Sequence, residues 1–132
     1  MTTVLLATDS DELFDEVDAA LGSAETDLLR VRAGVDVPPV CRERKPDLVL
    51  LDLQIGNMGG VATSLMVKQD QEAGRIDLLP VGLLLDRQAD VFLAGESRAD
   101  GWLIKPLDSL RLRRLAAALI AGEQFFDAAP VG

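Results

Sequence analysis

Two carboxylates and one lysine, Asp9, Asp52 and Lys105, each follow a short run of mostly apolar residues. Asp52 is the most informative of them, because it closes the uninterrupted run Leu48–Leu51. Burial without a partner costs about 2–7 kcal/mol even for an uncharged polar group, and more for a carboxylate. Such a residue is tolerated where the end of a strand opens into a crevice, which is where open α/β sheets keep their reactive groups. We therefore predict a functional site that contains Asp52.

The chemistry that these residue types favour is phosphoryl transfer. Two carboxylates a few ångströms apart repel one another, which creates a demand for a divalent cation. With oxygen ligands that cation would be Mg²⁺. A bound Mg²⁺ and a lysine ammonium are what an attacking carboxylate needs to receive a phosphoryl group, since the protein supplies position and charge neutralisation.

Composition excludes several other classes of protein. The chain has 132 residues, which is one domain of ordinary size, and it contains no histidine. This absence removes Ser-His-Asp and Cys-His catalysis, the usual zinc sites and a phosphohistidine carrier. The single cysteine, Cys41, excludes an internal disulfide and fits a reducing cytoplasm. A net charge of −9 without a basic stretch disfavours direct binding of nucleic acid.

Targeting and membrane segments are not expected either. No apolar run approaches the length of a transmembrane helix, and the first residues lack the basic region of a signal peptide. The sequence therefore predicts a cytoplasmic protein.

Apolar runs that alternate with helix-like segments should position the three charged residues. Strands are expected over Val4–Ala7, Asp27–Ala33, Leu48–Leu53, Leu79–Leu85 and Trp102–Ile104. Helices are expected from the N-cap Ser10 to Gly22, and over Asp36–Arg44, Val61–Glu72, Ala89–Ser97 and Leu107–Ala121. This order predicts a doubly wound, five-stranded parallel sheet in a three-layer, flavodoxin-like α/β/α sandwich. The expected strand order is 2-1-3-4-5, with a crevice between strands 1 and 3.

The end of the chain is expected to contribute little to this fold. We assign residues 1–121 to the domain and residues 122–132 to a short C-terminal tail. Phe125 and Phe126 should fold back onto the domain, or form a dimer contact if they are exposed. Arg111, Arg113 and Arg114 are expected on a solvated helix face.

With these elements in place, the chain resembles the response-regulator receiver domains of two-component signalling. The resemblance extends over residues 3 to about 121, and three motifs carry it. They are Val4–Asp9, Lys45–Leu53 and Gly101–Leu107. Their order and spacing make the resemblance specific.

The resemblance implies a role for each site residue. Asp52 would be the phosphoacceptor and a Mg²⁺ ligand, Asp9 a second Mg²⁺ ligand, and Gln54 would offer its backbone carbonyl to the metal. Lys105 would contact the phosphoryl oxygens, and the Lys105–Pro106 bond would be cis.

The chain also departs from the family pattern. Receivers usually carry two acidic residues after the first strand, but here the first is Thr8, either a structural substitute or a contact for a metal-bound water. After strand 4 the family has Ser or Thr, whose hydroxyl pulls the switch, whereas this chain has Leu85. Trp102 takes the other switch position.

We interpret the chain as a stand-alone response regulator rather than an enzyme, with at most self-catalysed phosphotransfer and dephosphorylation. Its partners would be a sensor histidine kinase or phosphotransfer protein and a downstream protein target. Neither nucleic acid nor membrane is expected, and the chain would be a monomer or weak homodimer. One alternative is a pseudo-receiver that binds partners independently of phosphorylation, which Thr8 and Leu85 favour. A flavodoxin-like cofactor binder is disfavoured, because the acidic loop after strand 1 would repel a phosphate.

Overall fold

A computed structural model of the chain describes residues 1–56 and 58–127. Its strands are β1 (Thr2–Ala7), β2 (Thr26–Val31), β3 (Leu48–Asp52), β4 (Val81–Leu85), β5 (Gly101–Ile104) and β6 (Phe125–Phe126). Its helices are α1 (Asp11–Leu21), α2 (Val37–Arg44), α3 (Gly60–Glu72), α4 (Val91–Gly95) and α5 (Ser109–Ile120). Two 3₁₀ turns, η1 (Gly34–Asp36) and η2 (Gln88–Asp90), precede α2 and α4.

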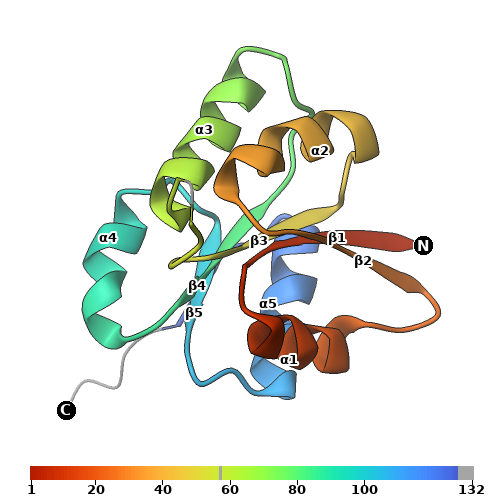
Figure 1. The fold of residues 1–132 in the computed structure, drawn as a ribbon, viewed down its shortest axis with the longest axis vertical. Helices are drawn as coiled ribbons and strands as arrows, with labels where there is room; N and C mark the ends of the chain where they lie inside the picture. Colours follow the sequence, from red (N-terminus) through yellow and green to blue (C-terminus); the bar gives the residue numbers. More distant parts are fainter. Residues whose placement is uncertain (57, 128–132) are drawn as a thin grey trace.

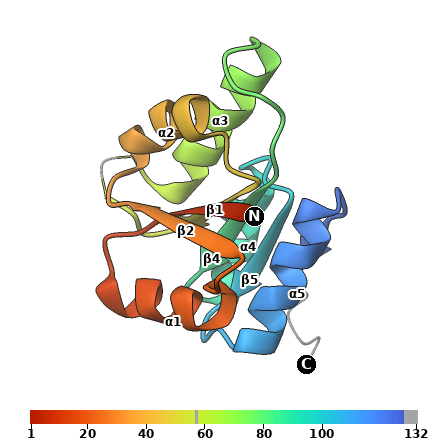
Figure 2. The same ribbon diagram turned by 90° about the vertical axis from the view of Figure 1, so that its right-hand side faces the viewer.

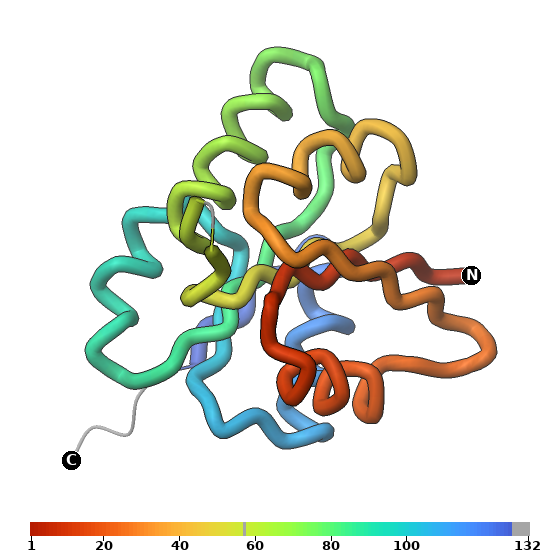
Figure 3. Tube along the Cα trace, viewed as in Figure 1, coloured from red at the N-terminus to blue at the C-terminus, as the bar shows by residue number. Residues whose placement is uncertain are grey.

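All strand pairs of the sheet are parallel, and the strand order is β2-β1-β3-β4-β5-β6. After β1 the chain moves to the edge strand β2 and then returns past β1 to β3, so the direction of winding reverses between β1 and β3 (Figure 3). The flavodoxin-like α/β fold and the switch point between strands 1 and 3 are therefore confirmed.

The predicted number of strands is wrong by one. Phe125 and Phe126, which we assigned to the tail, form β6 and pair with Gly101 and Trp102 of β5. A strand of two residues shows no alternation of apolar and polar positions, and its pairing depends on an edge far away in the sequence. The prediction that these two residues fold back onto the domain is confirmed.

The helices cover the sheet on both faces, as Figures 1 and 2 show. Helices α1 and α5 share one apolar core with the sheet, to which Val17 and Leu115 contribute. Helices α2, α3 and α4 form a second core on the opposite face, to which Val37, Val67 and Ala94 contribute. The three-layer arrangement follows from this division.

The burial of the strands agrees with their places in the sheet. Every residue of β3 and β4 is buried, as expected for central parallel strands covered on both faces. Every residue of β2 is half-buried, which fits an edge strand. Ser10 caps α1 as predicted, because its side chain accepts a hydrogen bond from the N–H of Leu13.

Two local predictions need correction. The helix expected over Ala89–Ser97 is shorter, since the Asp90 carboxylate accepts hydrogen bonds from the N–H groups of Asp86 and Arg87 and holds a 3₁₀ turn before α4. Arg111 is not simply solvated, because it forms an ion pair with Asp127. Across the described residues, no helix has the length and apolar character that crossing a membrane requires.

Candidate functional site

Asp52 is the last residue of β3 and lies between β1 and β4 at the carboxyl edge of the sheet. Only 3% of the residue is exposed. Helix α3 begins directly against this strand end: a Cβ on Gly60 would lie 2.9 Å from the carbonyl oxygen of Asp52. Any larger residue at position 60 would push the helix away, so glycine allows the close packing that fixes the backbone of Asp52.

Both oxygens of the Asp52 carboxylate accept hydrogen bonds. Oδ2 accepts from the Thr8 hydroxyl at 2.8 Å. Oδ1 accepts from Lys105 Nζ at 3.0 Å and from the backbone N–H of Gln54 at 3.2 Å. The structure therefore brings Asp52, Lys105, Thr8 and Gln54 together, and the buried charge of Asp52 is paired and hydrogen-bonded, as burial requires.

Lys105 is shared with a second carboxylate that sequence reasoning missed. Its Nζ lies 2.7 Å from Asp86 Oδ1, so one ammonium bridges Asp52 and Asp86. Burial alone would lower the pKa of Lys105, but hydrogen bonds to Asp86 and Asp52 outweigh it and raise that pKa. Asp86 directly follows the apolar run of β4, just as Asp52 follows the apolar run Leu48–Leu51, so the signal that identified Asp52 could have identified Asp86 as well.

The same contacts act on the ionisation of Asp86. Burial alone would raise the pKa of its carboxyl, but hydrogen bonds from Lys105 and Gln54 lower it below the ordinary value. Both shifts favour the charged forms, so the contact between Lys105 and Asp86 is an ion pair at neutral pH.

Thr8 is held in place from two sides. Its hydroxyl donates to Asp52 and accepts from the N–H of Ser10 at 3.0 Å. Its carbonyl accepts from Arg30 Nε at 3.1 Å. Arg30 lies on β2 and also pairs with Asp11 at 2.8 Å, and nothing in its sequence context indicated this role. Thr8 is also fully buried. Because these contacts fix its hydroxyl, Thr8 positions the carboxylate of Asp52.

Asp9 lies at the rim rather than inside the site. Its side chain is exposed, and none of the hydrogen bonds or ion pairs between described residues involves its carboxylate. A Cβ on Gly56 would lie 3.8 Å from Asp9 Oδ2, so this carboxylate reaches toward the loop that follows β3.

The oxygen donors at this rim are of the type that Mg²⁺ prefers, but they are few. Within residues 1–56 and 58–127, no group of three His, Cys, Asp or Glu side chains gathers around a common point. Mg²⁺ keeps several waters and takes one or two carboxylates, so Asp9, Asp52 and the Gln54 carbonyl are chemically adequate ligands. Because both oxygens of Asp52 already accept hydrogen bonds, we expect any metal binding to compete with Thr8 and Lys105.

The two switch positions differ in their surroundings. Leu85 ends β4 and is fully buried in the apolar core, where it offers no hydrogen bond to the site. Trp102 lies on β5, and its ring is 4.3 Å from that of Phe126, measured between centroids. The buried indole N–H of Trp102 has no hydrogen-bond partner among the described residues.

A pocket of about 220 Å³ opens beside the site. It is lined by Lys105, Pro106 and the first turns of α1, including Glu12 and Glu16. The Lys105–Pro106 peptide bond in its wall is cis, as predicted. The side chain of Lys105 is 25% exposed, so solvent reaches part of it.

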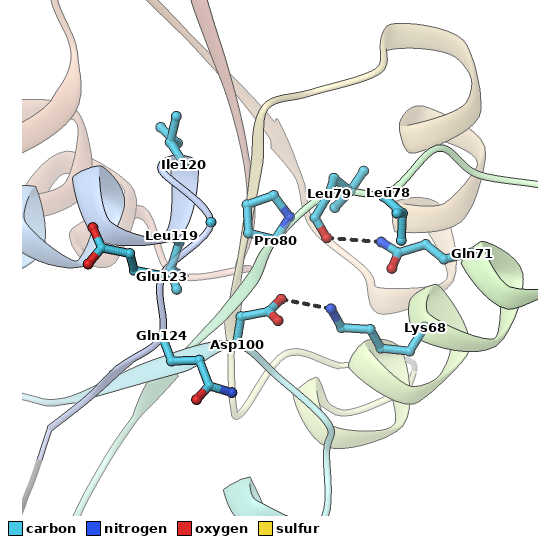
Figure 4. A pocket seen from close by; sticks show the side chains of 11 residues that line it. Lys68, Gln71, Leu78, Leu79, Pro80, Asp100, Leu119, Ile120, Glu123 and Gln124 are labelled. Carbon is cyan, nitrogen blue, oxygen red and sulfur yellow. Dashed lines mark hydrogen bonds and ion pairs between the residues drawn. The ribbon is translucent and has the colours of Figure 1, made fainter.

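A second pocket, of about 280 Å³, lies at the opposite end of the sheet, near the start of β4 and the end of α5 (Figure 4). Three of the polar side chains in its wall, Lys68, Gln71 and Asp100, are already hydrogen-bonded. Lys68 Nζ lies 2.7 Å from Asp100 Oδ2, and Gln71 donates to the carbonyl of Leu79 at 3.0 Å. The pocket lies at the end of the sheet opposite Asp52 and is not part of the site described above.

Comparison with known proteins agrees with this geometry. No family model matches the chain. The chain is 29% identical over 127 residues to the transcriptional regulatory protein AfsQ1 of Streptomyces coelicolor, covering 94% of this chain and 54% of that protein. It is 26% identical over 122 residues to Protein PilH of Pseudomonas aeruginosa, covering 92% of this chain and all of PilH. The chain thus spans about half the length of AfsQ1 and the whole length of PilH.

Solved structures share the fold. The signal receiver domain of a signal transduction histidine kinase from Syntrophus aciditrophicus superposes with a TM-score of 0.81 at 22% identity, covering 100% of this chain and 98% of that one. The chain therefore has the receiver fold. Together with the similarity to curated regulators, this confirms the resemblance to response-regulator receiver domains.

Proposed function

We propose that the chain is a response-regulator receiver domain that accepts a phosphoryl group on Asp52 and signals through protein–protein contacts. The observation that carries the proposal is the buried Asp52 carboxylate, held between the Thr8 hydroxyl and the Lys105 ammonium at the carboxyl edge of the sheet. These partners offset the cost of burying the charge and hold the carboxylate at a strand end, where open α/β sheets keep their reactive groups. Similarity to known response regulators supports the same conclusion.

The phosphodonor would be a phosphohistidine on a histidine kinase or phosphotransfer protein. One oxygen of Asp52 forms the new P–O bond while the P–N bond of the donor breaks, and the departing imidazole nitrogen takes up a proton. Lys105 Nζ, 3.0 Å from Oδ1, neutralises charge on the transferred group. The product is an acyl phosphate on Asp52.

A bound Mg²⁺ would supply further neutralisation of the anionic oxygens. Asp9, Asp52 and the backbone carbonyl of Gln54 would hold it. Because Asp86 holds the same ammonium at 2.7 Å, Lys105 must loosen that contact to follow the phosphoryl group. We therefore expect phosphorylation to be slower than the bare arrangement of Asp52 and Lys105 suggests.

Partners and location follow from the same proposal. The net charge of −9 disfavours nucleic acid as a target, so the chain would act on a protein. The single cysteine, Cys41, fits a reducing cytoplasm. We propose that it is a monomer or weak homodimer.

The experiment is incubation of the full chain with acetyl phosphate at millimolar Mg²⁺, followed by measurement of acid-labile phosphate. We expect acid-labile phosphate on the wild type and none on Asp52→Asn. Asp77→Asn is the matched control, since it removes the same charge from an exposed carboxylate that, within the described part of the chain, pairs with Lys45 alone. Absence of label on the wild type, together with no change in Trp102 fluorescence on adding beryllofluoride, would refute phosphoacceptance.

A second candidate is the pseudo-receiver, a module that binds its partner independently of phosphorylation. The specific observation in its favour is that both Asp52 oxygens are already hydrogen-bonded and that buried Leu85 provides no hydroxyl for a switch. It predicts that Asp52→Ala leaves partner binding unchanged. A loss of partner binding in that variant, with the fold intact by circular dichroism, would count against it.

A further inference from the structure

Of the two carboxylates that contact Lys105, Asp86 is the one open to solvent. Its side chain is 34% exposed, whereas the side chain of Asp52 is only 4% exposed. Water therefore reaches the carboxylate of Asp86 in the folded protein, directly beside the lysine that binds the phosphoacceptor.

Neighbouring groups hold Asp86 in this place. Its backbone N–H donates to Asp90 Oδ2 at 3.2 Å, and Asp90 itself is buried. Its carboxylate accepts hydrogen bonds from Lys105 at 2.7 Å and from the side chain of Gln54. The carboxylate is thus fixed beside the acceptor before any phosphoryl group arrives, which is what preorganisation requires of a group that acts on a reaction.

Phosphorylation of Asp52 would free the oxygen of Asp86 that Lys105 now holds. As Lys105 follows the phosphoryl group, its contact with Asp86 Oδ1 loosens. A carboxylate oxygen can only accept hydrogen bonds, so one that loses its donor and is open to solvent accepts from water instead. A water molecule would then take the place of the ammonium, next to the phosphoryl group.

The spacing of the two carboxylates suits an attacking water. Asp86 Oδ1 and Asp52 Oδ1 lie less than about 6 Å apart, because both bond to the same nitrogen. A water in line to attack phosphorus would lie roughly 5 Å from the Asp52 oxygen that carries the phosphoryl group. A single hydrogen bond from that water can therefore reach Asp86.

We infer, on the basis of the proposed function, that Asp86 orients the water that hydrolyses phosphorylated Asp52, so that the chain ends its own signal. The water oxygen bonds to phosphorus while the P–O bond to Asp52 breaks, and the electron pair of that bond stays on the Asp52 carboxylate. The released phosphate carries both hydrogens of the water. Asp86 is a catalytic residue of this step, because it contacts the attacking water.

The test is the rate at which the phosphorylated full chain decays. The chain is phosphorylated with acetyl phosphate, the donor is removed by rapid gel filtration, and acid-labile phosphate is followed over time at fixed Mg²⁺. Decay should be about fivefold slower in Asp86→Asn, which keeps an acceptor oxygen without the charge, because a hydrogen bond to a neutral group is weaker. It should be about fivefold slower again in Asp86→Ala, which keeps no acceptor. Asp77→Asn, which removes the same charge from an exposed carboxylate elsewhere, should decay like the wild type.

The comparison between asparagine and alanine separates the orientation of water from charge alone. Both variants remove the same negative charge from beside the phosphoryl group, so a purely electrostatic effect would give them equal rates of decay. Equal rates in the two variants, or decay of Asp86→Ala as fast as that of the wild type, would overturn the inference and leave phosphorylation of Asp52 intact. Absence of acid-labile phosphate on the wild type would overturn the proposed function as well.

Isotopic labelling gives a second readout on the wild type. In water enriched in the heavy isotope of oxygen, one heavy atom should enter each released phosphate and none should enter Asp52, because the water attacks phosphorus. Mass spectrometry of the phosphate and of the peptide that contains Asp52 measures both. Heavy oxygen in the carboxylate of Asp52 would place the attack at the acyl carbon and overturn the inference.

Discussion

Replacing Asp86 with Asn should speed phosphorylation of Asp52. Asp86 opposes the transfer in two ways, since it holds the ammonium of Lys105 at 2.7 Å and adds a negative charge beside the incoming phosphoryl group. Asparagine keeps the size of the side chain and removes the charge. Lys105 then becomes free to follow the transferred group.

The magnitude follows from the shared lysine. Asp86 Oδ1 and Asp52 Oδ1 bond to the same nitrogen at 2.7 and 3.0 Å, so they lie less than about 6 Å apart. At that separation two unit charges repel by about 0.7 kcal/mol in water and about 3 kcal/mol at an effective dielectric constant of 20. Asp86 is 34% exposed, so an intermediate value applies. We expect phosphorylation about tenfold faster, since 1.4 kcal/mol corresponds to that factor.

The assay is the initial rate of acid-labile phosphate formation with acetyl phosphate at fixed Mg²⁺ and ionic strength. Asp77→Asn serves as control, because it changes the net charge equally at an exposed pair whose atoms are 3.8 Å apart. A rate for Asp86→Asn no higher than that of Asp77→Asn would refute the idea that Asp86 restrains Lys105.

Three further predictions test the metal site, the ion pair and the buried thiol. Thr8→Asp adds a second acid beside Asp52. The attraction between the added carboxylate and Mg²⁺, roughly 1–4 kcal/mol, predicts Mg²⁺ binding at least about tenfold tighter. A Mg²⁺ titration followed by Trp102 fluorescence checks this, and unchanged affinity would contradict it. Lys105→Met should lower the free energy of unfolding at pH 7, measured by urea denaturation, by about 2 kcal/mol. This is less than the loss for a fully buried pair because Lys105 is 25% exposed. A loss below about 0.5 kcal/mol would mean that Asp52 does not depend on this cation. Burial raises the pKa of Cys41 to about 12, so above about pH 9 the unfolded thiol loses a proton that the folded one keeps and stability falls by up to about 1.4 kcal/mol per pH unit. Between pH 9 and pH 10.5, the Cys41→Ala variant should therefore lose less stability than the wild type. Equal losses in the two proteins would contradict this prediction.

The parts of the fold that depend on local sequence patterns were predictable. Leu48–Leu51 reads as a central strand because such a run must be covered on both faces, and the structure buries all of it. Ser10 reads as a helix start because its hydroxyl satisfies a free N–H, and it does so. The meeting of Asp52 and Lys105 followed from topology, since parallel strands end at one edge.

The features that we did not predict depend on contacts between residues distant in the sequence rather than on a local sequence pattern. Strand β6 exists because Phe125 and Phe126 meet the free edge of β5, and two residues carry no periodic signal. Arg111 was expected in solvent because its partner Asp127 lies 16 residues away in what appeared to be a tail. Asp86 was overlooked although it follows an apolar strand, because the resemblance directed attention to Leu85 beside it.

If Asp52 itself carries the phosphoryl group, chemical trapping of the modified residue must find it at that position. Borohydride reduces an aspartyl phosphate to homoserine, which peptide mass spectrometry can assign to one position in the chain. We expect homoserine at position 52 after treatment with acetyl phosphate. Homoserine at position 9 or 86 instead, or at none, would contradict it.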